Sequence, residues 1–388
     1  MIVFFWLCLF VIIYTFIGYG FLLFILVRLK RIFRKAYVLP LEGELPSVTI
    51  LVAAYNEEDI ISEKIENTFG LDYPKEKIQL IVITDGSTDR TAEKAGQYPD
   101  LLLLHEDIRA GKMAAIKRAI PFIEGEIIVF TDANTFLNKV AVRELVKHYR
   151  NEKVGAVAGE KRILVEEAAD ASSAGEGFYW KYESLLKKWD YELYSNVGAA
   201  GELFSIRTRL YQPVESDTII DDHMIAMRIA EKGFLIAYEP NAYAMETASA
   251  NTAEELKRKI RIAAGGIQSI FRLKKAANPF CFPVLTFQYI SHRVLRWTIT
   301  PFLLILVFFL NGRIAYQDGP VVYKVLFAAQ LVFYILSLAG WFFESRNVRI
   351  KAFFIPYYFC VMNYAVIAGI VRYFRKSQSA AWEKSKRK

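Results

Sequence analysis

Apolar positions divide the chain into an uncharged N-terminal segment, a mixed central region and a second group of apolar segments. Residues 2–27 contain no charged side chain, and a helix crosses a bilayer with about 20 apolar residues. The segment lacks the short apolar core and the small-residue cleavage site of a signal peptide. We therefore interpret residues 1–27 as an uncleaved transmembrane helix, followed by a basic linker at residues 28–46.

Residues 47–278 have the alternating pattern of an α/β domain. Near-continuous apolar runs predict strands buried on both faces of a parallel sheet, at residues 48–53, 78–83, 101–104 and 127–130. Amphipathic stretches between these runs predict helices at residues 57–69, 90–95 and 112–120. This order predicts a mostly parallel sheet with helices on both faces.

The chain becomes apolar again after this region. Residues 279–297 mix aromatic and charged side chains and are too polar to span, which predicts an amphipathic helix in the membrane interface. Residues 298–371 contain three apolar segments and predict about three C-terminal transmembrane helices. The first segment is short and carries Pro301, so it predicts either a full span or a re-entrant piece. Residues 372–388 form a basic tail.

Charge placement assigns sides but leaves one conflict. Arg28, Lys30 and Arg31 directly follow the first apolar segment, and the positive-inside rule places such a flank in the cytoplasm together with the central domain. If all four apolar segments cross, the C-terminus lies on the opposite side, yet the tail is basic. Either one C-terminal segment does not cross, or the charge rule is overridden.

The composition agrees with a soluble domain joined to membrane helices. Of 388 residues, 54% are hydrophobic and 23% are charged, which excludes disordered, collagen-like and disulfide-scaffold proteins. The net charge of +8 is concentrated beside apolar runs, which argues against nucleic acid as a partner. The three cysteines form no CxxC pair, so neither a zinc site nor a disulfide framework is indicated.

Polar and acidic residues collect at the ends of the four predicted strands, where ligands bind to open α/β sheets. The chain has neither a GxGxxG fingerprint after a strand nor a P-loop. The motifs in strand order are Ala54-Tyr55-Asn56-Glu57, Asp85-Gly86-Ser87-Thr88-Asp89, Gly111-Lys112 and Thr131-Asp132-Ala133-Asn134. Taken singly, each is also explained as a turn, a helix cap or a solvated residue. Their joint order favours a site for a nucleotide diphosphate, because aromatic, acidic and basic groups respectively suit base, ribose and phosphate.

With these motifs the chain resembles family 2 glycosyltransferases. More narrowly, it resembles the membrane-bound, cellulose-synthase-like group that includes hyaluronan and poly-N-acetylglucosamine synthases. The resemblance extends from Val48 to about Phe271. It implies a GT-A fold and inverting transfer from a nucleotide-diphosphate sugar, usually a UDP-sugar.

The resemblance also implies residue roles. Tyr55 and Glu57 would contact the nucleoside and Asp85 would read the base. Asp132 and Asn134 occupy the family's Asp-X-Asp metal motif and would hold Mg²⁺ or Mn²⁺, with an amide in the third position as the weaker ligand. The full set expected to bind the nucleotide sugar is Ala54, Tyr55, Glu57, Asp85, Lys112, Asp132, Arg258 and Arg261.

An acidic pair, Asp221 and Asp222, opens the helix predicted at residues 224–232. Without the resemblance, both acids are explained as helix N-terminal charges. The family match assigns Asp222 as the catalytic base and Asp221 as its support. An inverting transfer needs such a carboxylate to take the proton from the acceptor hydroxyl.

Two arginines, Arg258 and Arg261, match a further motif on the helix predicted at residues 253–271. They share one helix face at spacing i, i+3, and their alternative explanation is a solvated or membrane-facing basic surface. Processive relatives have Trp at the next position to hold the acceptor sugar, whereas this chain has Ile262. The substitution favours single-sugar transfer over processive polymerisation.

The sequence therefore predicts a multi-pass glycosyltransferase of a cell membrane, with bacterial inner membrane as the expected location and a cytoplasmic GT-A domain at residues 47–278. The expected partners are a nucleotide-sugar donor, membrane lipids, and a polysaccharide acceptor. The alternatives are transfer of one sugar to a membrane lipid and a non-catalytic scaffold subunit. Intact Asp85, Asp132 and Asp222 argue against the scaffold.

Overall fold

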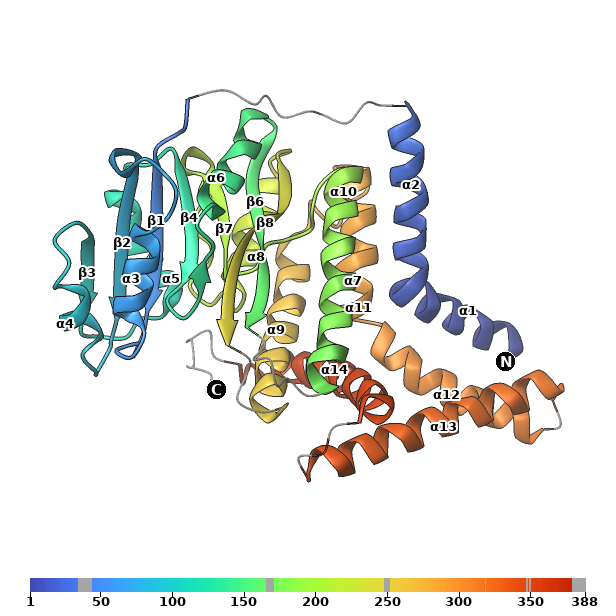
Figure 1. Cartoon of the computed structure of the whole chain (residues 1–388). Helices are drawn as coiled ribbons and strands as arrows, with labels where there is room; N and C mark the ends of the chain where they lie inside the picture. Colours follow the sequence, from blue (N-terminus) through green and yellow to red (C-terminus); the bar gives the residue numbers. More distant parts are fainter. Residues whose placement is uncertain are drawn as a thin grey trace.

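The structure is a computed structural model that describes residues 1–33, 44–164, 171–247, 252–317, 319–346, 348 and 350–378. Most of the predicted basic linker and the last ten residues of the basic tail lie outside the described residues. The described strands form one sheet in the order β3-β2-β1-β4-β7-β6-β8-β5 (Figure 1). Their bounds are β1 Val48–Ala54, β2 Ile78–Asp85, β3 Leu102–Glu106, β4 Ile127–Asp132, β5 Phe136–Leu137, β6 Val154–Leu164, β7 Phe204–Arg207 and β8 Leu235–Thr247.

The four predicted strands are confirmed as β1 to β4. They pair in parallel, and every residue of β1 is buried, as expected for a continuous apolar run covered on both faces. In register, Ala54 lies opposite Thr84 of β2, and Ala53 lies opposite Asp132 of β4. The motifs at the strand ends are therefore neighbours along one edge of the sheet.

The second half of the sheet is mixed. β7 pairs antiparallel with β4 and with β6, β8 pairs in parallel with β6, and β5 pairs antiparallel with β8. Two apolar cores lie on opposite faces of the sheet. One core contains α3 (Ile61–Phe69), α4 (Thr91–Ala95) and α6 (Ala141–Val146), and the other contains α5 (Lys112–Ala119) and α8 (Asp221–Ala230).

Long helices stand beside the β8 end of the sheet (Figure 1). They include α7 (Ala171–Leu193), which packs against α2 (Tyr19–Phe33), and α9 (Thr252–Arg272), which packs against α14 (Lys351–Phe374). The short helices α10 (Pro283–Tyr289) and α11 (Leu295–Trp297) are joined by a π-helical turn, η6 (Ile290–Val294). Another π-helical turn, η1 (Tyr14–Gly18), joins α1 (Ile2–Ile13) to α2, where the helix changes direction in Figure 1.

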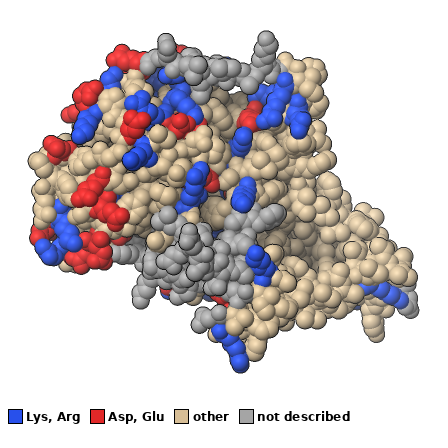
Figure 2. All heavy atoms as spheres, in the orientation of Figure 1, with Lys and Arg blue, Asp and Glu red and all other residues tan. Residues whose placement is uncertain are grey.

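Three described helices are long and apolar enough to cross a membrane: Ile2–Phe33, α13 (Val321–Glu344) and α14. The bent pair formed by Pro283–Trp297 and α12 (Thr300–Tyr316), with an angle of 61° between its parts, makes a fourth if it is one span. Figure 2 shows that charged side chains gather over the sheet, whereas the arm of apolar helices carries few of them on this face.

Candidate functional site

One cavity of about 600 Å³ lies between the sheet edge and the helices beside it. Six of the residues predicted to catalyse or to bind the nucleotide sugar line it: Lys112, Asp132, Asp221, Asp222, Arg258 and Arg261. A small adjoining cleft is lined by Ala54, Tyr55, Asp85 and Lys112. Lys112 and Gly111 line both and thereby connect the cleft to the cavity. Glu57 and Asn134 line neither; Glu57 is buried and Asn134 is half-buried.

The small cleft is held by the loop between β3 and α5. The guanidinium of Arg109 lies 3.8 Å from the ring centroid of Tyr55. Asp85 Oδ2 accepts hydrogen bonds from the backbone nitrogens of Ala110 (3.0 Å) and Gly111 (2.6 Å). Its other oxygen accepts one from Arg118 (3.0 Å). Asp85 thus fixes the loop that forms the cleft, and its reading of a base stays a prediction.

At the other side of this loop, Lys112 reaches a group of carboxylates. Its Nζ lies 2.9 Å from Asp132 Oδ1 and 3.5 Å from Asp221 Oδ2. Burial alone would lower the pKa of Lys112, but the charges of Asp132 and Asp221 outweigh it and raise the pKa. The lysine is therefore a permanent cation within an acidic site. We call Lys112, Asp132, Gly201, Asp221 and Asp222 the acidic end of the cavity.

Gly201 leaves an open space at the centre of this end. A Cβ at Gly201 would lie 3.4 Å from Asp222 Oδ2, 3.6 Å from Lys112 Nζ and 3.7 Å from Asp132 Oδ2. Three charged groups from three different elements thus converge on a position that any other residue would fill. The space is bordered by both signs of charge, as a site for a diphosphate and its counter-ion requires.

Asp222 sits in the first turn of α8 and lines the cavity. Burial, followed by the negative charge of Asp221, raises the pKa of Asp222 to about 7. A carboxylate with such a pKa accepts a proton near neutral pH, as a general base must. Asp221 Oδ2 is buried and makes no hydrogen bond within the described residues, and its ionic contact is with Lys112.

The two predicted arginines of α9 differ in their surroundings. Arg258 donates to both oxygens of Glu255 (3.0 and 2.9 Å) and lies 3.8 Å from Glu202 Oε1. Arg261 also lines the cavity, and within the described residues it makes no ion pair. Arg258 is therefore held by protein carboxylates, whereas the charge of Arg261 is available to a ligand.

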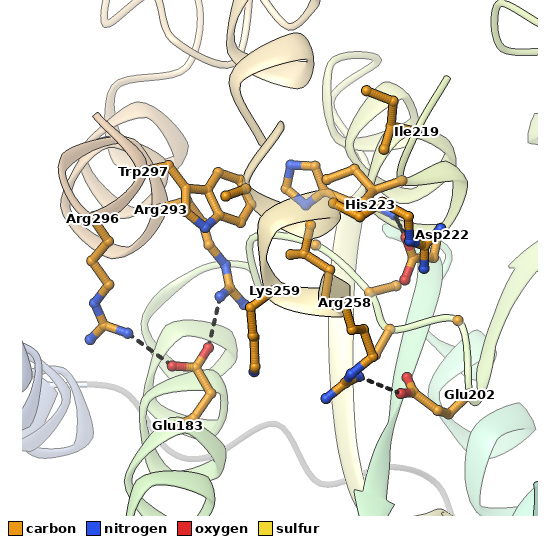
Figure 3. Close-up of a pocket in the computed structure, with 18 of the residues that line it drawn as sticks. Glu183, Glu202, Ile219, Asp222, His223, Arg258, Lys259, Arg293, Arg296 and Trp297 are labelled. Carbon is orange, nitrogen blue, oxygen red and sulfur yellow. Dashed lines mark hydrogen bonds and ion pairs between the residues drawn. The ribbon is translucent and has the colours of Figure 1, made fainter. Parts of the chain in front are cut away.

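Sequence reasoning missed the part of the cavity opposite these acids. We call His223, Arg293, Arg296 and Trp297 the aromatic end of the cavity. Figure 3 shows Arg293, Arg296 and Trp297 on one side, Asp222 and Glu202 on the other, and His223 between them. Both arginines pair with Glu183 of α7, at 2.8 and 3.0 Å. The sequence offers one signal for this end, Trp297 after a run of polar and basic residues, and that pattern predicts an interfacial helix rather than a binding site.

The comparison with known families supports the motifs. Residues 49–211 match the family described as glycosyl transferase family 2. Residues 49–211 form a family 2 glycosyltransferase domain. The matched segment contains β1 to β7 and the acidic residue Asp132, but it ends before Asp221 and Asp222.

Several curated proteins are similar to the region around this family 2 domain. A beta-monoglucosyldiacylglycerol synthase from Nostoc sp. is 34% identical over 178 residues, which is 44% of this chain and 36% of that protein. A poly-beta-1,6-N-acetyl-D-glucosamine synthase from Staphylococcus aureus is 28% identical over 239 residues, which is 59% of this chain and 57% of that protein. The alignments thus span between about a third and three fifths of these relatives' length.

One solved structure matches almost the whole chain. It is a mannosyltransferase from Pyrobaculum calidifontis in complex with GDP-Man and Mn²⁺, with a TM-score of 0.72 and 23% identity over 95% of this chain and 98% of that one. At this identity the match shows the fold. The predicted GT-A fold, flanked by apolar helices that are long enough to span a membrane, is therefore confirmed.

Proposed function

We propose that this protein is an inverting, membrane-bound glycosyltransferase that moves a sugar from a nucleotide-diphosphate donor to an acceptor hydroxyl. The observation that carries the proposal is the convergence of Asp222, Lys112 and Asp132 on the open space at Gly201, beside a family 2 domain. The relatives named above, whose names give a glucosylated diacylglycerol and a poly-N-acetylglucosamine as products, support the reaction class.

The acidic end supplies the groups that the reaction needs. Asp222 takes the proton of the acceptor hydroxyl while the oxygen of that hydroxyl attacks the anomeric carbon. The bond from that carbon to the diphosphate oxygen breaks, and its electron pair leaves with the diphosphate. Lys112 and Arg261 line the cavity and hold the negative charge that develops on this leaving group. Asp221 maintains the charge of Lys112 and raises the pKa of Asp222.

A divalent cation is part of this proposal. Within the described residues no group of three or more His, Cys, Asp or Glu side chains forms a metal site. A cation carried by a diphosphate needs only one or two protein oxygens. Asp132 faces the space at Gly201, so this carboxylate fits a metal held jointly by protein and donor. Asn134 does not line the cavity, and its role as the weaker ligand stays a prediction. Mn²⁺ or Mg²⁺ would neutralise the diphosphate there, and the Mn²⁺ of the structural neighbour favours Mn²⁺.

The acceptor approaches from the membrane side. The cavity is also lined by Phe16 of the first apolar helix and by a row of residues on α14: Phe354, Ile355, Tyr358, Phe359, Met362, Asn363, Ala365 and Val366. Both helices are long and apolar enough to span a bilayer. The cavity therefore suits a growing polysaccharide that leaves along these helices, and equally a lipid whose chains lie among them.

We propose a topology with three spans. If Ile2–Phe33, α13 and α14 cross and the bent pair is re-entrant, the basic residues that follow α14 return to the side of the family 2 domain. Both basic segments then lie in the cytoplasm, as the positive-inside rule requires. This arrangement removes the conflict found in the sequence and places the domain at the cytoplasmic face of a cell membrane.

The test is release of nucleotide from a panel of UDP-, GDP- and dTDP-sugars by the purified protein in nanodiscs, with Mn²⁺ or Mg²⁺ and native lipid extract. Release from one donor, lost in Asp222→Asn, would establish the reaction and identify the donor. The size of the product would then separate a polymer from a glycolipid. A protein whose function in cells is unchanged by Asp222→Asn, and that releases no nucleotide from any donor, would be a scaffold.

A further inference from the structure

The inference concerns the aromatic end of the cavity, and it rests on the proposed glycosyl transfer. His223 follows the proposed base directly, and its backbone nitrogen donates to Asp222 Oδ1 at 2.8 Å. Its side chain lines the cavity between Asp222 and Trp297 (Figure 3). A ligand that contacts His223 and Trp297 therefore lies close to Asp222, the carboxylate proposed to take the acceptor's proton.

His223 is built as an incomplete hydrogen-bonding group. Only 4% of the residue is exposed, yet within the described residues its Nε2 has no hydrogen-bond partner. Gly198 makes this packing possible, because a Cβ there would lie 2.4 Å from His223 Nδ1. A buried polar atom without a partner costs free energy, and such an atom in a cavity indicates a ligand that completes it.

His223 is also uncharged. Burial, and then the nearby positive charge of Arg293, lower its pKa to about 3. The two arginines of this end are already engaged, because Arg293 and Arg296 share the carboxylate of Glu183. The polar side chain left for a ligand beside Asp222 is therefore the neutral His223, which suits an uncharged ligand better than a phosphate.

Trp297 completes this end with an aromatic ring. Its ring stands edge-on to His223, with centroids 5.4 Å apart and an interplanar angle of 77°. It lies against α9 at Gly266, where a Cβ would be 2.6 Å from the indole. Ile262 and Gly266 are four residues apart and hence share one face of α9. The indole is therefore one helical turn from the position where the sequence lacks the expected tryptophan.

Trp297 also has an unused polar group. Within the described part of the chain its indole nitrogen donates no hydrogen bond. A polyhydroxylated ligand has an apolar C–H face that packs on an aromatic ring, and hydroxyls that bond a ring nitrogen at its edge. The neutral His223 and the indole of Trp297 present both kinds of contact to one ligand.

We propose that His223 and Trp297 form the acceptor site and bind an uncharged, polyhydroxylated group, with the hydroxyl to be glycosylated directed at Asp222. The charge of the acceptor follows from the chemistry as well. A neutral hydroxyl needs a base to become a nucleophile, whereas a phosphate is already an anion and needs none. Two sources share this chemistry: the sugar end of a glycan and the glycosyl or glycerol head group of a lipid.

The test measures acceptor KM, donor KM and acceptor-independent release of nucleotide for His223→Leu, His223→Gln, Trp297→Ala and Trp297→Phe. The acceptors are a soluble oligosaccharide, a diacylglycerol in nanodiscs and a polyisoprenyl phosphate in nanodiscs. We expect His223→Leu and Trp297→Ala to raise the KM of the neutral acceptor about tenfold, the worth of one lost hydrogen bond or ring contact. The amide of His223→Gln and the ring of Trp297→Phe should restore part of the loss, and donor KM should stay within twofold.

Trp189→Phe is the matched control, because Trp189 packs against Phe24 and does not line the cavity. The neutral acceptor that the protein glycosylates, the oligosaccharide or the diacylglycerol, shows whether the natural acceptor is a glycan or a lipid. Two outcomes would overturn the inference: preference for the phosphate acceptor, or an acceptor KM that stays within twofold of wild type in both His223→Leu and Trp297→Ala. The proposed function would still stand in either case, provided that the wild-type protein releases nucleotide from a donor. A wild-type protein that releases no nucleotide from any donor would instead remove the proposed function itself. Donor binding by each variant confirms that it is folded.

Discussion

The acidic and aromatic ends of one cavity are built on opposite principles. At the acidic end, charged side chains of opposite sign lie against one another, as Lys112 does with Asp132 and Asp221. At the aromatic end, His223 has a buried nitrogen with no partner among the described residues, and Arg293 and Arg296 share the single carboxylate of Glu183. The first arrangement stores charge for a charged ligand, and the second leaves hydrogen bonds for a neutral one. The cavity therefore distinguishes its two substrates by charge.

The largest expected effect lies where the two ends meet. We expect Asp222→Asn to lower kcat about a thousandfold, within the range typical for loss of a general base, while donor KM changes little. Nucleotide release and donor binding, measured on the same preparation, would check this. Asp107→Asn, at an exposed position outside the cavity, is the matched control. Residual activity within tenfold of wild type would place the base elsewhere.

The next effect tests the charge stored at the acidic end. Removal of divalent cations by a chelator should lower activity about a hundredfold, since metal and preorganised charge contribute several kcal/mol at a developing anion. Mn²⁺ or Mg²⁺ should restore it in the wild type but not fully in Asp132→Asn. Titration of the apoprotein with each ion would rank the two metals. Unchanged activity in chelator would show that Lys112 and Arg261 carry the leaving-group charge alone.

The fold of the first half was predictable because its signals are local in sequence. Each strand from β1 to β4 is a continuous apolar run, and each motif follows its own strand, so Asp85 and Asp132 could be assigned to one sheet edge. The mixed second half was not predicted, since antiparallel β7 joins β4 to β6 across a long chain separation. Parallel runs alone do not reveal where a sheet changes direction.

The site divides in the same way. The acidic end follows from short motifs, and the structure brings Lys112, Asp132 and Asp222 together as the motifs imply. The aromatic end combines side chains of α8, η6 and α11, with Glu183 of α7 as the ionic partner of its arginines. These elements meet only through the packing of helices that share no motif. Its clearest feature, the His223 nitrogen that has no partner in the described part of the chain, is a property of burial and has no signature in the sequence.

A smaller effect tests the open space at the acidic end without changing any charged side chain. We expect Gly201→Ala to raise donor KM about tenfold, because the methyl group would occupy the space between Asp222, Lys112 and Asp132 and displace ligand atoms worth one or two contacts. The Cβ would keep distances of 3.4 Å or more, so folding should be unaffected. Thermal melting and donor titration check both statements. Unchanged donor KM would mean that the diphosphate lies away from Gly201.

The smallest effect concerns pH and depends on both ends together. Because the pKa of Asp222 is raised to about 7, its basic form is lost as the pH falls through that value. The rate of sugar transfer should therefore be about halved at pH 7 relative to pH 9. At lower pH it should fall about tenfold for each further pH unit. His223, with its pKa lowered to about 3, stays neutral over this range and adds no second limb. A rate profile with two acid limbs would show that His223 becomes charged in the working enzyme, and the charge distinction between the ends would then fail. A single limb that is unchanged in His223→Gln would locate the titration at Asp222, where the acceptor hydroxyl gives up its proton.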